Sequence, residues 1–447
     1  MASAAEQLAS SINFGAFSKA TELKKRIWFT LGALIIYRLG TYIPLPGIDS
    51  HALEALFQQQ AGGIIGMFDM FSGGALRRMT IFALNIMPYI SASIIMQLMT
   101  SISPSLEAIK KEGESGRKKI NQYTRMLTVF LAAAQAFGIA NGLAAMRAPS
   151  GPVVIASGPF FYITTVVSLT AGTVFLMWLG EQITQRGVGN GTSLIIFSGI
   201  VARLPAALIG TLELGRTGAL ELWVILLIAV VVVGVIAFIV YFERAQRRII
   251  VQYPKRQVGN KMFGGEASHL PLKLNSSGVI PPIFASSLLL LPASITGFGA
   301  GAGSGWAQWF ALYLGHGTPL YLILYVALIV FFAFFYTAVV FNPQETADNL
   351  KKYGGFIPGI RPGKNTADYL DYVLTRLTVL GAAYLAFVCV LPEMLLSWKA
   401  LPFYFGGTSL LIVVSVTMDT VAQIHSHLLA HQYEGLIKKS KLRGRRG

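Results

Sequence analysis

The chain has 447 residues, of which 54% are apolar or aromatic and only 13% are charged. Charged and polar residues must cover a water-soluble fold, so this composition excludes a soluble globular protein, and 28 Phe, 17 Tyr and 6 Trp exclude a disordered chain. The formal net charge of +16 is compatible with contact to nucleic acid, to an anionic membrane surface or to an acidic partner.

The N-terminal part of the chain predicts a membrane anchor followed by a short apolar segment. An apolar run at 27–45 contains Arg38 and is followed by no small-residue cleavage pattern. This favours a retained anchor over a cleaved signal peptide. The next apolar segment, 61–74, lies between glycine pairs and is too short to cross a bilayer. It is typical of either a re-entrant helix or a helix in an external loop.

Ten apolar runs along the chain approach the ~20 residues that a membrane helix requires. In chain order they are 27–45, 79–101, 126–145, 160–180, 192–212, 219–242, 277–298, 319–341, 374–395 and 405–424. The seventh begins with Pro281 and Pro282, which predict a kinked or mobile helix. Only helices and closed barrels satisfy the backbone in lipid, and the short alternating segments of a barrel are not seen. The sequence therefore predicts an all-α membrane protein with ten transmembrane helices.

The positions of Lys and Arg predict how these spans are oriented. With a cytoplasmic N-terminus, most of the 36 Lys and Arg lie in cytoplasmic segments, as the positive-inside rule requires. Ten spans then leave both termini in the cytoplasm and divide into two sets of five, and related halves would form an inverted repeat. The predicted domains are a cytoplasmic tail at 1–26, a first half at 27–212 that includes 61–74, a second half at 219–424 with cytoplasmic loops at 243–275 and 342–373, and a basic cytoplasmic tail at 425–447.

Residues that carry chemistry are scarce inside the predicted spans. Asp419 and Arg203 stand isolated, and no chain of Asp, Glu or His crosses the membrane, so the usual machinery of an ion-coupled transporter is absent. The sequence contains neither an HExxH motif nor the Walker A lysine motif. His427 and His431 have helical i,i+4 spacing without further ligands, and Cys389 is the only cysteine. We therefore expect no catalytic residues, no metal and no cofactor.

The two predicted cytoplasmic loops at 243–275 and 342–373 are long for simple connections. The first interleaves cations with β-branched and aromatic residues, and the second carries Arg361 between Ile360 and Pro362. They fit either a docking platform for a large acidic partner or segments that only set topology and touch lipid headgroups. Two hypotheses for the chain follow, a passive gated polypeptide channel driven by a partner and, as the alternative, an inverted-repeat secondary transporter of a small solute.

Five sequence strings resemble the SecY family, whose members are the main subunits of bacterial protein-conducting channels. They are GGALRRMTIFALNIMPYISASI (73–94), KKEGESGRKKINQYTR (110–125), WLGEQITQRGVGNGTSLIIF (178–197), NPQETADNLKKYGGFIPGIRPG (342–363) and PFYFGGTSLLIVV (402–414). The resemblance covers nearly the whole chain and implies a clamshell of two inverted five-helix halves with a short plug helix. It implies the central pore-forming subunit, which translocates unfolded secretory polypeptides across the bacterial cytoplasmic (inner) membrane and releases membrane-protein helices laterally.

The resemblance also implies roles for individual residues. A mid-membrane apolar ring would seal the pore and comprise Ile86, Ile90, Thr192, Ile196, Ile283 and Ile412. Thr192 replaces the aliphatic residue usual in the family, and Asn85 beside the ring replaces a usual glycine, so both make the constriction more polar. The second and seventh spans would form a lateral gate with Ser91 and Ser287 as a facing pair. The plug would comprise Gly62, Gly63, Ile64, Ile65, Met67, Phe68, Met70, Phe71, Gly73 and Gly74.

The partners implied by the resemblance surround and drive the channel. SecE would close the clamshell and SecG would accompany it, and the SecA motor and the ribosome would dock at Arg361, Arg247, Arg248, Lys255 and Arg256. Signal sequences, nascent polypeptides and membrane lipids would contact the channel itself, SecD/SecF and YidC would be optional further partners, and ribosomal RNA would be contacted only through a docked ribosome. Because the chain lacks an ATP-binding motif, the energy would come from the SecA ATPase, the ribosome or the proton motive force.

Overall fold

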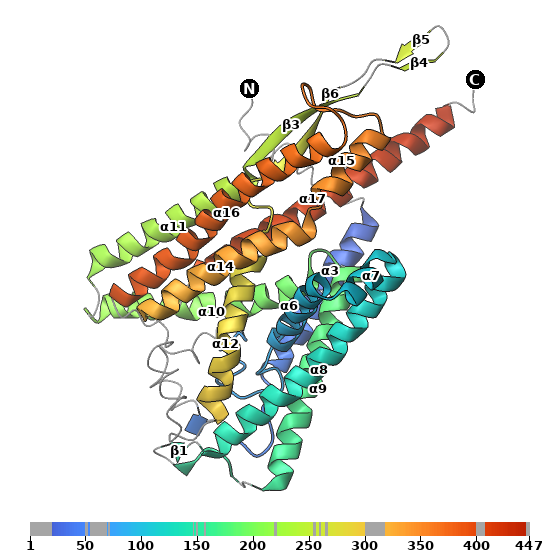
Figure 1. Cartoon of the computed structure of the whole chain (residues 1–447). Coiled ribbons are helices and arrows are strands. Elements are labelled where there is room, and N and C mark those ends of the chain that lie inside the picture. The colour runs from blue at the N-terminus through green and yellow to red at the C-terminus, as the bar shows by residue number, and fades with distance from the viewer. Residues whose placement is uncertain are drawn as a thin grey trace.

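Helices form most of this computed structural model, and short antiparallel strands form the rest of its regular structure (Figure 1). The structure describes residues 20–49, 52–53, 69, 72–145, 147–148, 151–155, 158–218, 221–253, 256–258, 261–263, 267–299, 318–398 and 407–443. The helices are α3 (Thr21–Gly40), α6 (Met87–Ile102), α7 (Pro104–Lys111), α8 (Glu114–Ala145), α9 (Pro159–Arg186), α10 (Gly191–Arg216), α11 (Leu222–Arg244), α12 (Ile280–Gly299), α14 (Pro319–Val340), α15 (Pro343–Lys352), α16 (Lys364–Trp398) and α17 (Gly407–Arg443). The strands are β1 (Arg147–Ala148), β2 (Gly151–Pro152), β3 (Gln246–Gln252), β4 (Arg256–Val258), β5 (Lys261–Phe263) and β6 (Ala267–Lys273).

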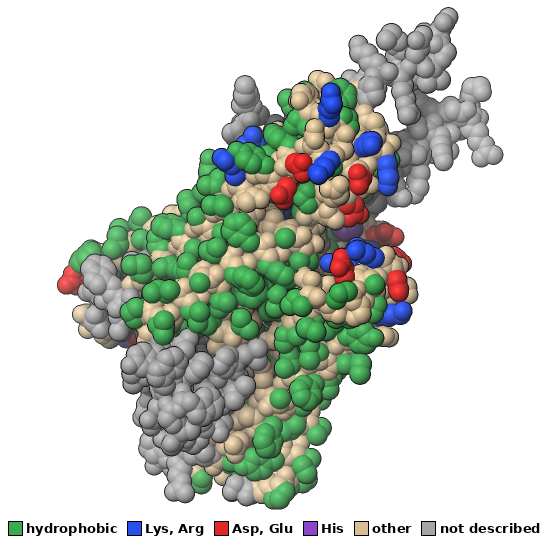
Figure 2. Space-filling model, viewed as in Figure 1, with side chains coloured by type: hydrophobic (Ala, Val, Ile, Leu, Met, Phe, Trp, Pro, Cys, Tyr) green, Lys and Arg blue, Asp and Glu red, His purple; other side chains and the backbone are tan. Residues whose placement is uncertain are grey.

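Seven of the described helices are long and apolar enough to cross a membrane, namely α8, α9, α10, α11, α14, α16 and α17. α6 and the first part of α12 are shorter apolar helices. The side chains of Trp223, Leu226 and Val233 on α11 are 57%, 67% and 66% exposed, and such an apolar surface calls for lipid rather than water. On the face drawn in Figure 2, most charged side chains gather instead at the end where α7, α15 and the β3–β6 hairpin lie. The chain is thus a multi-pass membrane protein.

The helices pack in two groups that meet along two seams (Figure 1). α8 packs on α6 and α9, and α3 packs on α9 and α10, whereas α14 packs on α12 and α16, and α16 on α17. α12 also contacts α6 and α8, and α17 contacts α3 and α10. The two predicted halves of the sequence therefore touch through different helices on the two seams, and one large apolar cluster runs across both groups.

The helix predicted at 79–101 begins later than expected. α6 starts at Met87, and residues 72–86 form a segment of turns. Met79 and Asn85 have φ angles of 43° and 51°, in the left-handed region that a continuous right-handed helix excludes. The prediction is wrong for the first two turns because apolar composition alone does not reveal these backbone conformations.

The turn segment 72–86 is held by backbone pairing with the end of the first apolar run. Thr80 forms an isolated antiparallel bridge with Pro44, and the Leu45 amide donates to the Met79 carbonyl oxygen at 2.9 Å. Asn tolerates the left-handed region better than most residues. This gives a conformational reason for Asn85 at a position where the family usually has glycine.

Two other sequence predictions change in detail. α8 and α16 start well before the spans predicted at 126–145 and 374–395, and their added turns are mostly polar. Pro281 and Pro282 do not interrupt the seventh helix, because α12 begins at Ile280 and both prolines lie in its first turn. At that position a proline removes an amide that has no partner within the helix.

The predicted loop at 243–275 contains an antiparallel hairpin, which the sequence analysis did not predict. β3 pairs with β6 from Gln246 opposite Lys273 to Gln252 opposite Ala267. Along β3, Ile249 and Val251 are 6% and 2% exposed, whereas Ile250 between them is 48% exposed. This alternation of β-branched residues is the pattern of a strand with one buried face.

Candidate pore, gate and docking surface

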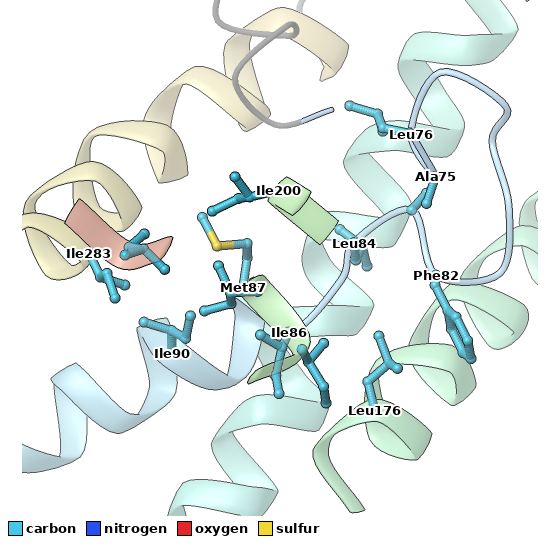
Figure 3. Close-up of a cluster of buried hydrophobic side chains, with 14 of the residues drawn as sticks. Ala75, Leu76, Phe82, Leu84, Ile86, Met87, Ile90, Leu176, Ile200 and Ile283 are labelled. Carbon is cyan, nitrogen blue, oxygen red and sulfur yellow. The ribbon is translucent and has the colours of Figure 1, made fainter. Parts of the chain in front are cut away.

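Five of the six side chains predicted to ring the pore lie in one buried apolar cluster. Ile86, Ile90, Ile196, Ile283 and Ile412 are between 0% and 8% exposed. They come from the start of α6, from α10, from α12 and from α17, so segments far apart in the sequence supply one cluster. Figure 3 shows Ile86, Ile90 and Ile283 grouped in it. A constriction of packed, branched apolar side chains resists wetting and therefore blocks ions.

The same large cluster contains Met87 and Ile200, two residues that the sequence did not single out. Met87 and Ile200 are 4% and 1% exposed and lie among the isoleucines in Figure 3. Ile200 follows Ile196 by one helical turn on α10, and this spacing places both on one face of the helix. The i,i+4 spacing was thus a signal in the sequence that could have found Ile200.

Thr192 departs from the other five predicted ring residues. Its side chain is half-buried and lines a polar cavity of about 290 Å³. Arg125 donates to both carboxylate oxygens of Glu181 in this cavity, at 2.9 and 2.6 Å, so this carboxylate already has a cationic partner. The described residues contain no group of three side chains that could hold a metal ion. The other residues lining the cavity are Tyr89, Asn121, Thr124, Thr184, Gln185 and Asn190.

Local contacts at the start of α10 fix the position of the predicted ring residues that this helix carries. The side chain of Asn190 caps the helix by accepting a hydrogen bond from the Thr192 amide at 3.1 Å. Gly191 packs so closely on Gly180 of α9 that a Cβ at Gly191 would overlap the carbonyl oxygen of Gly180. Glycine is therefore required here for the approach of the two helices, which sets where Ile196 stands.

The predicted plug lies mostly outside the described residues. Gly73 and Gly74, at its end, have φ angles of 64° and 87°, which glycine adopts without strain. The Gly73 carbonyl oxygen accepts a hydrogen bond from Arg38 Nη1 at 2.9 Å. This end of the segment is therefore attached to α3. The predicted plug residues outside the described ranges are Gly62, Gly63, Ile64, Ile65, Met67, Phe68, Met70 and Phe71.

The predicted gate pair lies on two helices that pack against each other. Ser91 is on α6 and Ser287 is on α12, and their residues are 3% and 2% exposed. Within the described part of the chain, the Ser287 hydroxyl has no hydrogen-bond partner. A buried hydroxyl without a partner costs free energy.

The two basic loops form one surface rather than two. Gln252 at the end of β3 and Phe356 exchange both backbone hydrogen bonds, each at 2.9 Å. Beneath them, Ile249 and Ile357 pack with Leu370 of α16 in a separate small apolar cluster. We call the β3–β6 hairpin together with residues 353–363 the basic platform. It rests on the polar end of α16.

The predicted docking residues fall on or near the basic platform. Arg247 and Arg248 on β3 and Arg361 in the 353–363 segment are exposed. Lys255 lies outside the described residues, and Arg256 is described only through its backbone in β4. The structure therefore brings Arg247, Arg248 and Arg361 onto one surface.

Arg361 stands at the tip of a turn built around two glycines. Gly359 and Gly363 have φ angles of 83° and 112°, so both positions favour glycine. The Thr366 hydroxyl donates to the Arg361 carbonyl oxygen at 2.9 Å. The backbone on both sides of Arg361 is thereby constrained while its guanidinium remains accessible.

Comparison with known proteins places this geometry among related chains. The family model described as SecY matches residues 80–421. A protein translocase subunit SecY of Rickettsia typhi is 58% identical over 429 residues, which cover 96% of this chain and 99% of that protein. A solved SecY structure, described by a plug domain that stabilises the closed channel and maintains a membrane seal, aligns with a TM-score of 0.66 at 20% identity and covers 91% of this chain and 92% of that one. A canine Sec61 in a ribosome–channel complex aligns with a TM-score of 0.60 at 18% identity, again over 91% and 92%.

Proposed function

We propose how polypeptides pass through this chain, given that it belongs to the SecY family. It is the pore-forming subunit of a protein-translocation channel, and the 58% identity to a translocase subunit over nearly the whole chain carries this conclusion. A small-solute transporter is not favoured, because the relatives are protein translocase subunits.

We propose that ten of the helices cross the bacterial inner membrane, with both termini in the cytoplasm. They are α3, α6, α8, α9, α10, α11, α12, α14, α16 and α17. The apolar exposed faces of the long helices and the gathering of charge at one end support this topology. The polar turns of α8 and α16 and the basic platform then project into the cytoplasm.

In the proposed resting state, the isoleucine cluster closes the pore at mid-membrane. Branched apolar side chains would surround a passing polypeptide without binding it, so that the channel releases every sequence it admits. The segment 61–74 would fill the outer side of the pore as a plug. A plug domain with this role is described for the solved SecY structure, which supports the assignment here.

We propose that the channel opens at the seam between α6 and α12 and that partners bound to the basic platform drive it. Signal sequences would enter this seam, and membrane-protein helices would leave through it into lipid. SecA or a ribosome would dock on the platform and supply energy with the proton motive force, while SecE and SecG would complete the complex. The ribosome-bound canine relative supports a ribosome as one partner.

A translocation assay tests this function directly. The chain is purified with its small partner subunits and reconstituted in proteoliposomes with SecA, ATP and a secretory precursor. We expect part of the precursor to become protected from added protease, and this protection to disappear when SecA or ATP is left out. Absence of protection with active, bound SecA would contradict the proposal.

Replacing Ile196 with Asn should raise the resting ion conductance of the channel about fivefold. A polar side chain in the ring lowers the cost of wetting the constriction, and a fivefold change corresponds to about 1 kcal/mol. Conductance is measured in planar bilayers without precursor. Ile239→Asn is the matched control, because Ile239 on α11 is as buried as Ile196 but lies outside the predicted ring. Equal conductance in both variants would contradict the role of Ile196.

Deleting residues 62–73 should increase the resting conductance about tenfold, because the outer stopper of the pore is removed. SecA-driven translocation of a precursor should continue, since the isoleucine ring and the basic platform remain. Both quantities are measured on the same vesicles. Unchanged conductance in a folded deletion variant would remove the plug assignment.

A further inference from the structure

The connector at 274–279 joins the β3–β6 hairpin of the basic platform to α12, the helix on one side of the proposed gate. At its start, the Leu274 amide donates to the Ala245 carbonyl oxygen at 3.0 Å, so the hairpin closes directly on the end of α11. At its other end, α12 carries Ile283 of the predicted ring and Ser287 of the predicted gate pair. The connector is therefore the direct covalent path from the platform to the gate helix.

Asn275 is the centre of a hydrogen-bond network in this connector. Its side-chain Nδ2 donates to Glu243 Oε1 at 2.8 Å and to the Gly278 carbonyl oxygen at 3.0 Å, and its Oδ1 accepts from the Ser277 hydroxyl at 3.0 Å. Asn275 and Ser277 are 3% and 4% exposed. A single buried side chain thus ties the end of α11 to the turn that precedes α12.

The turn that leads into α12 has a shape that these bonds hold. Gly278 has a φ angle of 62°, in the left-handed region, and its carbonyl oxygen is the one that Asn275 binds. α16 also packs closely on the connector, because a Cβ on Gly381 would lie 3.0 Å from the Leu274 carbonyl oxygen and 3.5 Å from Asn275 Cα. The backbone of Asn275 therefore rests on α16, while its side chain sets how α11 and the start of α12 lie relative to each other.

Glu243 stands at an unfavourable place for an acidic side chain. It lies half-buried in the last turn of α11, where the negative end of the helix dipole disfavours a carboxylate. A carboxylate removed from water requires hydrogen-bond partners, and the Asn275 amide supplies one. Because the carboxylate does not stabilise the end of its own helix, its contribution at this position is the contact with Asn275.

We propose that Asn275 is a positioning residue that couples the basic platform to the gate, because its bonds make the end of α11, the base of the hairpin and the start of α12 move together. A partner that displaces the hairpin would then turn α12 and open its seam with α6. Without these bonds, the connector would bend at Gly278, and the same partner would bind without opening the seam. This inference rests on the proposed roles of the platform and of the α6–α12 seam.

The test follows one thiol at the proposed gate. Ser287→Cys in a Cys389→Ala background leaves a single thiol in the chain, at a position that is buried while the seam is closed. Its labelling rate by a water-soluble thiol reagent is measured in proteoliposomes, with and without SecA and a non-hydrolysable ATP analogue. We expect SecA to raise this rate about tenfold when Asn275 is present and less than about twofold in Asn275→Ala, a usual size for coupling between two sites. Without SecA the two rates should be equal.

The second readout separates docking from turnover. SecA should bind Asn275→Ala with unchanged affinity, because the exposed cations of the platform are retained, while translocation at saturating SecA should fall about tenfold. A merely structural role would instead lower the yield of folded complex or raise the labelling rate without SecA. Ser276→Ala is the matched control, because this neighbouring hydroxyl donates to the Lys273 carbonyl oxygen at 3.0 Å, within its own turn. It should behave as the unmodified chain.

Exchanging the two partners tests the bond itself. Asn275→Asp places a carboxylate beside that of Glu243 and should abolish the response to SecA, whereas Glu243→Gln keeps an oxygen that accepts from Asn275 and should retain most of it. In the double variant, the amide at position 243 can donate to the carboxylate at position 275, so part of the response should return. A folded double variant that responds no better than Asn275→Asp would overturn coupling through this bond.

Precursor translocation by the unmodified channel separates the possible failures. If that channel does not translocate a precursor with SecA and ATP, the proposed function itself has failed. If it translocates but SecA leaves the labelling of Ser287→Cys unchanged, the proposed role of the seam has failed and the inference falls with it. If SecA raises the labelling equally in chains with and without Asn275, only the coupling through Asn275 is overturned.

Discussion

Replacing Arg361 with Glu is expected to reduce SecA-driven translocation about 100-fold while leaving the amount of folded, membrane-inserted channel unchanged. Arg361 is exposed at the tip of a turn that Gly359 and Gly363 shape. Reversing its charge converts attraction to an acidic partner surface into repulsion. A 100-fold loss corresponds to about 2.7 kcal/mol, within the range for one charge of a paired interface.

The control for this prediction separates a local effect from a change in net charge. Lys118→Glu alters the charge of the chain by the same amount and lies at an exposed position near the start of α8, outside the basic platform and both predicted docking loops. We expect it to change translocation by less than about threefold, as for a charge at the rim of an interface. Both variants are assayed with saturating and limiting SecA, and a defect that saturating SecA repairs locates the loss in docking. Equal defects in the two variants would contradict a specific role for Arg361.

Cross-linking α6 to α12 is expected to stop translocation almost completely. Cys389 is the only cysteine of the chain and is buried, so Cys389→Ala gives a background without thiols. Ser91→Cys and Ser287→Cys then place one thiol on each side of the proposed gate, and a short, reducible bifunctional reagent joins them. The seam cannot open to a signal sequence while the link is present. Protease protection of the precursor reports the result.

The same preparation provides its own controls. Each single-cysteine variant, treated with the reagent, should translocate normally, because one modified thiol does not join the helices. Cleaving the link with a reductant should restore most of the lost activity in the double variant, which excludes damage to the fold. Normal translocation through a fully linked channel would show that this seam does not open.

The helices of this fold were predictable because lipid imposes long apolar runs, and each predicted run overlaps a helix of the structure. The start of α6 at Met87 was not predictable. The φ angles of Met79 and Asn85 go together with backbone pairing of this segment to Pro44 and Leu45, which lie far away in the sequence. Composition records which residues are apolar but not which backbone groups are already paired elsewhere.

The candidate site was likewise predictable only in part. The five isoleucines that the resemblance assigned to the ring are buried in the large apolar cluster, as apolar side chains between packed helices are, and their role as a pore ring stays a prediction. Arg203 forms an ion pair with Asp69, and this partner was not predictable, because Asp69 is 134 positions away and each charge alone is compatible with many contacts. The polar surroundings of Thr192 depend likewise on α8 and α9, which the local sequence does not specify.

The two hydrogen bonds between Gln252 and Phe356 have a mechanical consequence. They join the hairpin and the 353–363 segment into one unit that is mounted on α16, which in turn packs on α14 and α17. A partner bound to this unit, as we propose, would act first on these three helices. Their displacement as a group would change two sets of contacts, those of α12 with α6 and α8 and those of α17 with α3 and α10, so binding at a distance from the pore would reach both seams of the fold.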